Sequence, residues 1–292
     1  MCLNGVKRNI VSPAGNLGLF VRLAGHTFQK PSKGKMMKIA KSATRLAAVA
    51  AASTALAGLS ACSTNPYTGQ SQFILVDQAQ LAQAAAASWQ DIKAEERISN
   101  DAALNRRART VAGRVIQAAG LQEQNWEIVV FDSDERNAFA LPGGRIGVYR
   151  GMMEFASSDA ELATVISHEV AHVVARHAAE RYSQQVGTAV GAQVVGGALG
   201  GAENADQYAK VFGVGAQLGL LLPYSRAHER QADLLGVDYM TQAGYDPYAA
   251  VRLWEKMAQS GGSAGPGFLS THPDPGARAR DIEAYIQQKN YS

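Results

Sequence analysis

Three residues in one short segment have the types and spacing of a metal-dependent hydrolase. Residues 168–172 read His-Glu-Val-Ala-His, so two histidines lie four positions apart. On a helix these side chains project from the same face, where two neutral imidazoles can bind one zinc ion. Glu169 is then placed to act as a general base on a water molecule beside the metal. The alternative is a core helix with two hydrogen-bonded histidines, which leaves the glutamate between them unexplained.

The residues around this segment predict the helix that the spacing requires. Ser158-Asp159-Ala160-Glu161 has the form of a capping box, with Ser158 as the N-cap and Glu161 three residues later. Apolar residues then recur at helical spacing, and no glycine or proline occurs before Gly187. We expect a buried helix over about 159–185, with His177 turned away from the ligands, at the surface or behind them.

A catalytic zinc site usually has a third protein ligand and one open position. The metzincin pattern takes that ligand from the same segment, but its glycine and histidine are replaced here by Ala175 and Ala178. A later segment offers a carboxylate instead. Glu229 can complete the metal site, and Asp233, one turn further on, can accept a hydrogen bond from a ligand imidazole. The alternative is a solvent-exposed helix on which both acids pair with arginines.

These motifs resemble those of the HtpX-like and CAAX-prenyl-protease-like zinc metallopeptidases, which are gluzincins. Three more segments match in order: Asn137–Gly144 (Asn-Ala-Phe-Ala-Leu-Pro-Gly-Gly), Ser225–Asp233, and Ser270-Thr271-His272-Pro273 followed by Arg278. The last is similar to a segment of the soluble bacterial members. The resemblance covers roughly residues 75–290. It implies one zinc ion held by His168, His172 and Glu229, with Glu169 as the general base.

The order of elements predicts a mostly helical α+β fold with a small β-sheet beside the zinc-binding helix. Besides the helix already described, we expect helices over about 77–98, 101–119, 229–243, 247–259 and 275–288. Strands are expected at 126–131 and 145–149. In gluzincins an edge strand at the cleft pairs with the substrate backbone, and Gly147, Val148 and Tyr149 are the candidates here. An ordinary sheet strand is equally consistent with these residues.

Two further segments are candidates for controlling the site. His272 lies beside Pro273 and can bind zinc as an inhibitory fourth ligand, donate a hydrogen bond to the tetrahedral oxyanion, or simply lie at the surface. Residues 186–222 are rich in glycine and alanine, and their apolar pieces are too short to cross a bilayer. We expect two closely packed helices there, or a hairpin over the cleft.

Residues 1–61 have the features of a secretory signal. They contain nine lysines or arginines and no acidic residue, and an apolar run over 46–59 ends in small residues. The ending Leu-Ser-Ala-Cys62 resembles a bacterial lipobox, which implies a lipidated tether at 62–74 before a metallopeptidase domain at 75–292. A transmembrane anchor is the alternative. Because Met36 and Met37 offer a more compact start, residues 1–35 are expected to be an upstream extension.

Removal of the signal reverses the charge of the chain. The formal net charge falls from +3 to −6, so the basic balance gives no support for nucleic-acid binding. The serine after Cys62 indicates the outer membrane of a Gram-negative bacterium, facing the periplasm. We therefore expect a zinc metalloendopeptidase that degrades misfolded or stalled envelope proteins. The alternative is an assembly factor that binds unfolded or misassembled outer-membrane proteins and rarely cleaves them.

Overall fold

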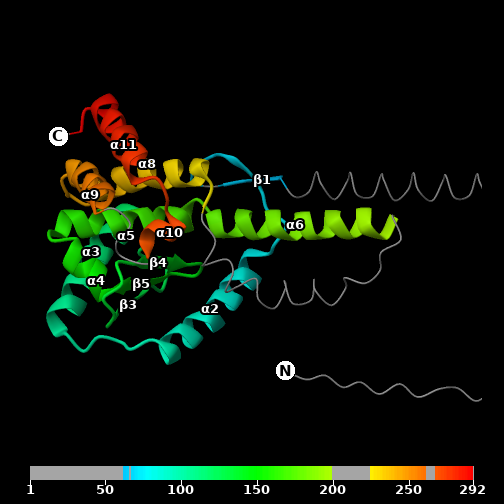
Figure 1. Ribbon diagram of the computed structural model, residues 1–292, viewed down its shortest axis with the longest axis horizontal. Helices are drawn as coiled ribbons and strands as arrows, with labels where there is room; N and C mark the ends of the chain where they lie inside the picture. The colour runs from blue at the N-terminus through cyan, green and yellow to red at the C-terminus, as the bar shows by residue number, and fades with distance from the viewer. Residues whose placement is uncertain (1–61, 66, 199–223, 261–266, 292) are drawn as a thin grey trace, which may run out of the picture. The chain divides into compact units, whose positions relative to one another are not determined.

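The computed structural model describes residues 62–65, 67–198, 224–260 and 267–291 (Figure 1). This part of the chain is mostly helical, which confirms the predicted α+β class. The helices are α2 (Gln78–Glu95), α3 (Ala102–Ala118), α4 (Arg150–Phe155), α5 (Asp159–Val174), α6 (His177–Ala198), α8 (Arg226–Gln242), α9 (Tyr248–Gln259), α10 (Phe268–Thr271) and α11 (Pro275–Lys289). The strands are β1 (Cys62–Thr64), β2 (Ser71–Phe73), β3 (Glu127–Phe131), β4 (Ala138–Leu141) and β5 (Arg145–Tyr149).

The main sheet has three strands in the order β3-β5-β4. The central strand β5 is parallel to β3 and antiparallel to β4. The expectation that Gly147–Tyr149 form an edge strand is therefore wrong. The chain turns back at Pro142-Gly143-Gly144, so the Asn-Ala-Phe segment forms β4 and covers that side of β5. Since both sides of β5 are paired, its backbone has no free edge for a substrate.

Helix α5 lies at the centre of the fold, between the sheet and the helices α8 and α9 (Figure 1). Every residue from Leu162 to His172 is buried, because α5 is covered on all sides. Its N-terminus is the predicted capping box: the Ser158 hydroxyl accepts a hydrogen bond from Glu161 N, and Glu161 Oε2 accepts one from Ser157 N. A helix covered in this way holds its polar side chains in a dry environment.

The helix does not continue to residue 185 as expected. It ends at Val174, and Arg176 has a φ of 56°, in the left-handed region, before α6 begins at His177. No glycine or proline marks this break, so the local sequence carries no sign of it. The break changes the direction in which the following residues face.

The segment expected to be an extended tether forms a hairpin that covers the end of α5. Strands β1 and β2 pair antiparallel, and the Asn65 side chain between them is fully buried. Asn65 Nδ2 donates to Val174 O over 2.9 Å, and Gln72 Nε2 donates to Ala175 O over 2.6 Å. These two side chains satisfy carbonyl groups that the helix C-terminus leaves without partners.

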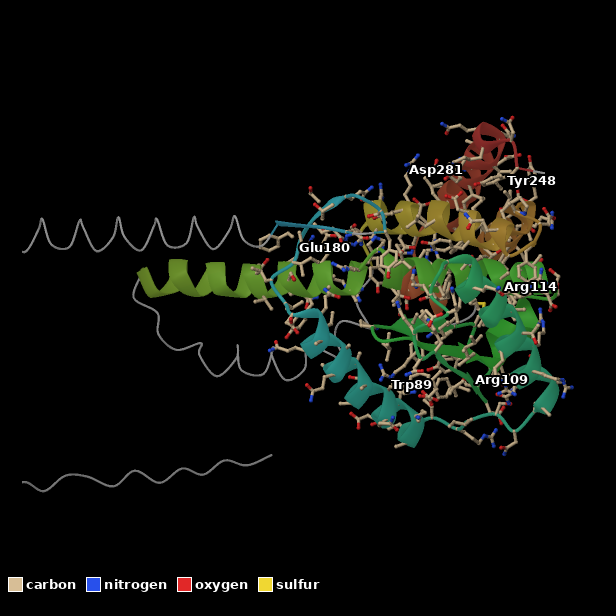
Figure 2. All side chains as sticks on the ribbon, turned by 180° about the vertical axis from the view of Figure 1, so that it is seen from behind. Trp89, Arg109, Arg114, Glu180, Tyr248 and Asp281 are labelled. Carbon is tan, nitrogen blue, oxygen red and sulfur yellow. The ribbon has the colours of Figure 1, made fainter. Side chains whose placement is uncertain are left out.

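Helix α2 packs on the other face of the sheet, where Trp89 is fully buried among Phe131, Leu141 and Tyr149 (Figure 2). Among the residues described, no helix combines the length and the hydropathy that a membrane span requires. Part of the glycine-rich segment 186–222 belongs to α6, and its residues 199–222 lie outside the described residues.

Candidate metal centre and substrate cleft

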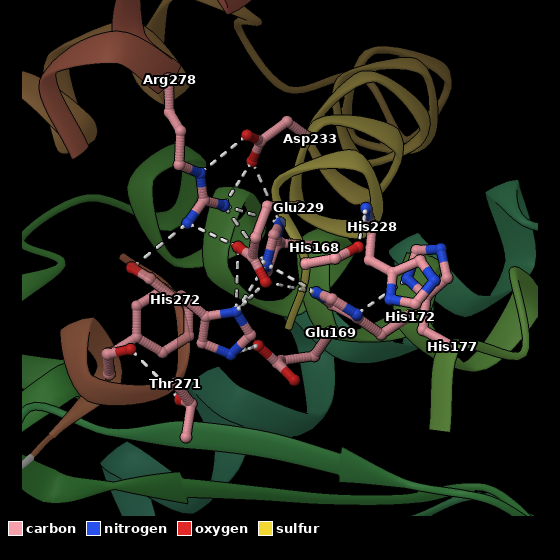
Figure 3. Close-up of polar contacts among 12 residues, drawn as sticks. His168, Glu169, His172, His177, His228, Glu229, Asp233, Thr271, His272 and Arg278 are labelled. Carbon is pink, nitrogen blue, oxygen red and sulfur yellow. Dashed lines mark hydrogen bonds and ion pairs between the residues drawn. The ribbon is translucent and has the colours of Figure 1, made fainter. Parts of the chain in front are cut away.

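Four buried side chains converge where α5, α8 and the residue after α10 meet (Figure 3). His168 and His172 come from α5, Glu229 from α8, and His272 from the C-cap of α10; their candidate ligand atoms all lie within 4.8 Å of one another. His168 Nε2 lies 3.0 Å from His172 Nε2, 3.1 Å from His272 Nδ1 and 3.5 Å from Glu229 Oε2. Ligands of a tetrahedral zinc ion are about 3.3 Å apart, so this donor set fits zinc.

The position of Glu229 depends on how closely α8 crosses α5. Ser225 caps α8 by accepting a hydrogen bond from His228 N, which places Glu229 in the first turn. Further along α8, an ideal Cβ on Gly236 would lie 3.1 Å from His168 N and 3.3 Å from His168 Cα. Only glycine permits this approach without displacement, so the spacing of the two ligand-bearing helices is fixed at Gly236.

Asp233 lies where the sequence predicted a partner for a ligand imidazole. Its Oδ1 is 3.1 Å from His168 Nδ1, so it can accept the N–H of that nitrogen and leave Nε2 free for a metal. Arg278, whose role sequence reasoning missed, donates to Asp233 over 2.6 and 2.8 Å and pairs with Glu229 Oε2 at 2.8 Å. Its guanidinium packs 3.5 Å from the Trp254 ring centroid. A fixed cation thus balances two buried carboxylates.

His177 performs the same task for the second histidine. The ring is fully buried, so it lies behind the metal site and not at the surface. Burial and the neighbouring His228 lower the pKa of His177 to about 3, which keeps the ring neutral. Its Nε2 donates to Gln231 Oε1 over 2.9 Å, so its Nδ1 accepts from His172 Nδ1 over 2.9 Å. His172 Nε2 is then left with its lone pair directed at the metal position.

Glu169 projects from α5 into a cavity of about 550 Å³ beside the metal centre. Its Oε2 accepts a hydrogen bond from Ala140 N over 3.1 Å, whereas its buried Oε1 has no hydrogen-bond partner and lies 3.3 Å from His272 Nε2. Burial raises the pKa of Glu169 to about 7, against the opposing effect of His168. A carboxyl group that is poised to gain or lose a proton near neutral pH suits acid–base catalysis.

The cavity is lined mainly by β4, and the strand that the sequence suggested contributes a single residue. Asn137, Ala138, Phe139 and Ala140 contribute to its wall. Of the three residues predicted to bind substrate, only Tyr149 reaches the cavity, and Gly147 and Val148 are buried within the sheet. Tyr224, whose ring lies 4.0 Å from that of His172, also lines a second cavity of about 220 Å³ at the other end of β4.

Comparison with known proteins agrees with this geometry. The model of Peptidase family M48 matches residues 102–286. The mitochondrial metalloendopeptidase OMA1 of Schizosaccharomyces pombe is 36% identical over 61% of this chain and 52% of its own length. The beta-barrel assembly-enhancing protease of Escherichia coli is 27% identical over 65% of this chain and 40% of its own. The chain therefore spans about half the length of these relatives, or less. The predicted metallopeptidase family is confirmed, and the predicted zinc cofactor agrees with a His-His-Glu-His cluster that is positioned for a metal ion.

Proposed function

Because the chain belongs to peptidase family M48, we propose that it is a zinc-dependent endopeptidase that cleaves misfolded or stalled proteins. The observation that carries the proposal is the position of the Glu169 side chain. It is buried beside the four-residue cluster, one of its oxygens has no hydrogen-bond partner, and it faces a cavity large enough for a peptide. A buried carboxylate oxygen without a hydrogen bond is costly, and a purely structural site has no use for it.

A zinc ion held by His168, His172 and Glu229 would supply a Lewis acid for the scissile carbonyl and would increase the acidity of a nearby water molecule. Glu169 Oε1 accepts the proton of the attacking water molecule and delivers it to the leaving amine. Ala140 N holds the other oxygen, Oε2, and so fixes the direction of Oε1. His177 and Asp233 hold the ligand imidazoles in the tautomers that leave Nε2 unprotonated.

The substrate backbone is proposed to pair with the free edge of β4. Tyr149 N donates to Asn137 O across the β4–β5 ladder, so the backbone groups of Ala138 and Ala140 alternate to the opposite side. The hydrogen bond from Ala140 N to Glu169 supports this direction. Because Ala138 N donates to Asn137 Oδ1, the carbonyl groups of Ala138 and Ala140 are the groups proposed to accept hydrogen bonds from the substrate backbone. Main-chain pairing of this kind binds extended chains with little dependence on their sequence.

His272 is proposed as a fourth ligand that limits activity until a substrate displaces it. Its Nδ1 lies 2.9 Å from Glu229 Oε1 and 3.1 Å from His168 Nε2, which supports ligation over donation to an oxyanion. We expect His272→Ala to retain zinc and to raise the rate of peptide cleavage. A large loss of turnover with zinc retained would favour the oxyanion role instead.

The cellular setting is proposed to be the periplasmic side of a bacterial outer membrane, with the chain anchored by a lipid on Cys62. The support is the signal-like composition of residues 1–61 and the Leu-Ser-Ala-Cys ending. Cys62→Ser is expected to move the protein from the membrane fraction to the soluble fraction and to abolish incorporation of labelled palmitate. Retention of both properties would contradict a lipid anchor at Cys62.

A second candidate function is the assembly of outer-membrane proteins without cleavage. It is favoured by the relatives that are named beta-barrel assembly-enhancing proteases. The deciding experiment compares the zinc-loaded protein with Glu169→Gln on casein, an unfolded substrate. Cleavage by the parent alone supports the endopeptidase. Cleavage by neither, with one zinc ion bound per chain and assembly defects corrected equally by both, supports the assembly factor.

A further inference from the structure

One wall of the substrate cavity is strongly acidic. It contains Asp91, Glu95 and Glu96 at the end of α2 and Glu135 in the loop before β4. No lysine or arginine occurs among the described residues that line this cavity. Because Glu169 also faces the cavity with an unpartnered buried oxygen, this wall lies in the same cleft as the proposed general base.

The four carboxylates differ from their neighbours in having no cationic partner. On the adjoining surface, Glu127 pairs with Lys93, and Asp132 pairs with both Arg97 and Arg150. Across the described parts of the chain, no such ion pair involves any of the four acidic residues of the cavity wall. Uncompensated like charges in a concave surface produce a negative potential that attracts a cation.

The negative charge of these residues does not stabilise the C-terminal end of α2. Glu95 is the last residue of α2 and Glu96 is its C-cap. The C-terminus of a helix carries a partial negative charge, so acidic residues there reduce the stability of the helix. A set of residues that opposes local stability in an active-site cleft is better explained by binding than by folding.

Aromatic rings complete the same wall. Phe139 and Tyr149 both line the cavity, and their ring centroids are 6.3 Å apart. Burial, followed by the negative charges of Glu96 and Glu135, raises the pKa of Tyr149. An aromatic face flanked by carboxylates suits the long apolar stem and charged head of lysine or arginine.

We propose that this wall is a specificity subsite for a basic side chain, lysine or arginine, within three residues of the scissile bond. Phe139 and Tyr149 contact the apolar stem of that side chain, and Glu96 and Glu135 bind its charged group. The inference rests on the proposed endopeptidase function and specifies the substrates within it. Proteins with basic extended segments would be cleaved in preference to acidic ones.

Binding can test the subsite without relying on catalysis. The probes are fluorescein-labelled octapeptides of alanine and valine in which lysine, norleucine or glutamate is placed at each position in turn. Their Kd is measured on the full-length, zinc-loaded Glu169→Gln variant, so that binding is measured without cleavage. The lysine peptides are expected to bind about 5- to 20-fold more tightly than the norleucine peptides, with a preference that weakens as salt is added. Glu96→Gln/Glu135→Gln in this background should reduce the ratio towards one, whereas Glu123→Gln, an exposed glutamate outside the cavity, should preserve it.

Cleavage of the same peptides by the parent enzyme separates the two proposals. A lysine preference in binding but no cleavage, either by the parent or by His272→Ala, would contradict the endopeptidase and leave the subsite supported. Cleavage without a lysine preference would overturn the subsite alone. The subsite would also be overturned if the double substitution left the preference unchanged in a protein that retains zinc and its circular dichroism spectrum.

Discussion

A single methyl group at Gly236 should reveal how tightly α5 and α8 are packed. Replacing a glycine inside a helix with alanine normally stabilises a protein by about 1 kcal/mol, because glycine loses more backbone entropy on folding. Here the added carbon would lie 3.1 Å from His168 N and 3.3 Å from His168 Cα, both in the buried part of α5. Overpacking of a close-packed core costs roughly 1–3 kcal/mol, so we expect Gly236→Ala to lower the free energy of unfolding by about 0.5–2 kcal/mol.

The added methyl group should also push α5 and α8 apart, which changes the metal site. Helix α8 carries Glu229 and Asp233, whereas the imidazole that both of them approach belongs to His168 on α5. Moving the helices apart by a few tenths of an ångström lengthens both contacts. We expect zinc affinity to fall about tenfold, as it does when the partners of metal ligands are disturbed.

Gly113 provides the matched control. It lies in the exposed face of α3, and a Cβ built on it has no neighbour within 4 Å. Gly113→Ala should therefore stabilise the protein by about 0.5–1 kcal/mol and leave zinc binding unchanged. Urea unfolding of the metal-free proteins and zinc titration against a chelating dye measure both effects. If Gly236→Ala stabilises as much as Gly113→Ala and binds zinc as tightly as the parent, the close-packing argument is refuted.

Three further predictions concern other contacts of the same framework. Asp233→Asn should weaken zinc binding about 10- to 100-fold in a competition titration, because it removes the charge that orients His168. Asn65→Ala should lower the free energy of unfolding in urea by roughly 2–3 kcal/mol, because it leaves buried hydrogen-bonding groups unpaired. Burial raises the pKa of Glu161. Hydrogen bonds from Ser157 and the charge of Lys256 lower this pKa by a larger amount, so the net shift is downward. The stability that this shift contributes is present above the ordinary pKa of 4.5 and lost as pH falls through the lowered value. Glu161→Gln should therefore flatten the decline in unfolding free energy below pH 4.5 when melts are compared across pH.

The starts of α2, α3 and α5 could be predicted because single residues determine them, whereas α8 begins at Arg226 and not at the expected residue 229. Asp77, Asp101 and Ser158 each accept hydrogen bonds from the first turn of the helix that follows. The order of the strands could not be predicted, because β4 and β5 both have buried faces and their pairing depends on tertiary contacts. The break at Arg176 was also missed, since a left-handed arginine has no sequence signature.

The candidate metal ligands on α5 and α8 were recognisable because two of them lie one turn apart and Glu229 belongs to a segment that resembles a known motif. Their supporting residues were harder to identify. Arg278 follows Asp233 by 45 residues, so no local spacing relates the two. The burial of His177 results from the break before α6, and no residue pattern in the sequence predicts that break. A histidine five positions after a ligand was nevertheless a signal that deserved weight.

The separation of the candidate metal ligands along the chain determines at which stage of folding the site is assembled. His168 and His272 are 104 residues apart, and Arg278 lies 110 residues beyond His168. Closing loops of this length is entropically unfavourable until α8, α10 and α11 have docked on α5, so the four ligands assemble late in folding. A partly folded chain with an exposed α5 can hold only two of them. Assembly of the four-residue cluster is thereby tied to completed tertiary structure, so under the proposed function a partly folded copy would lack the site that cleaves peptides.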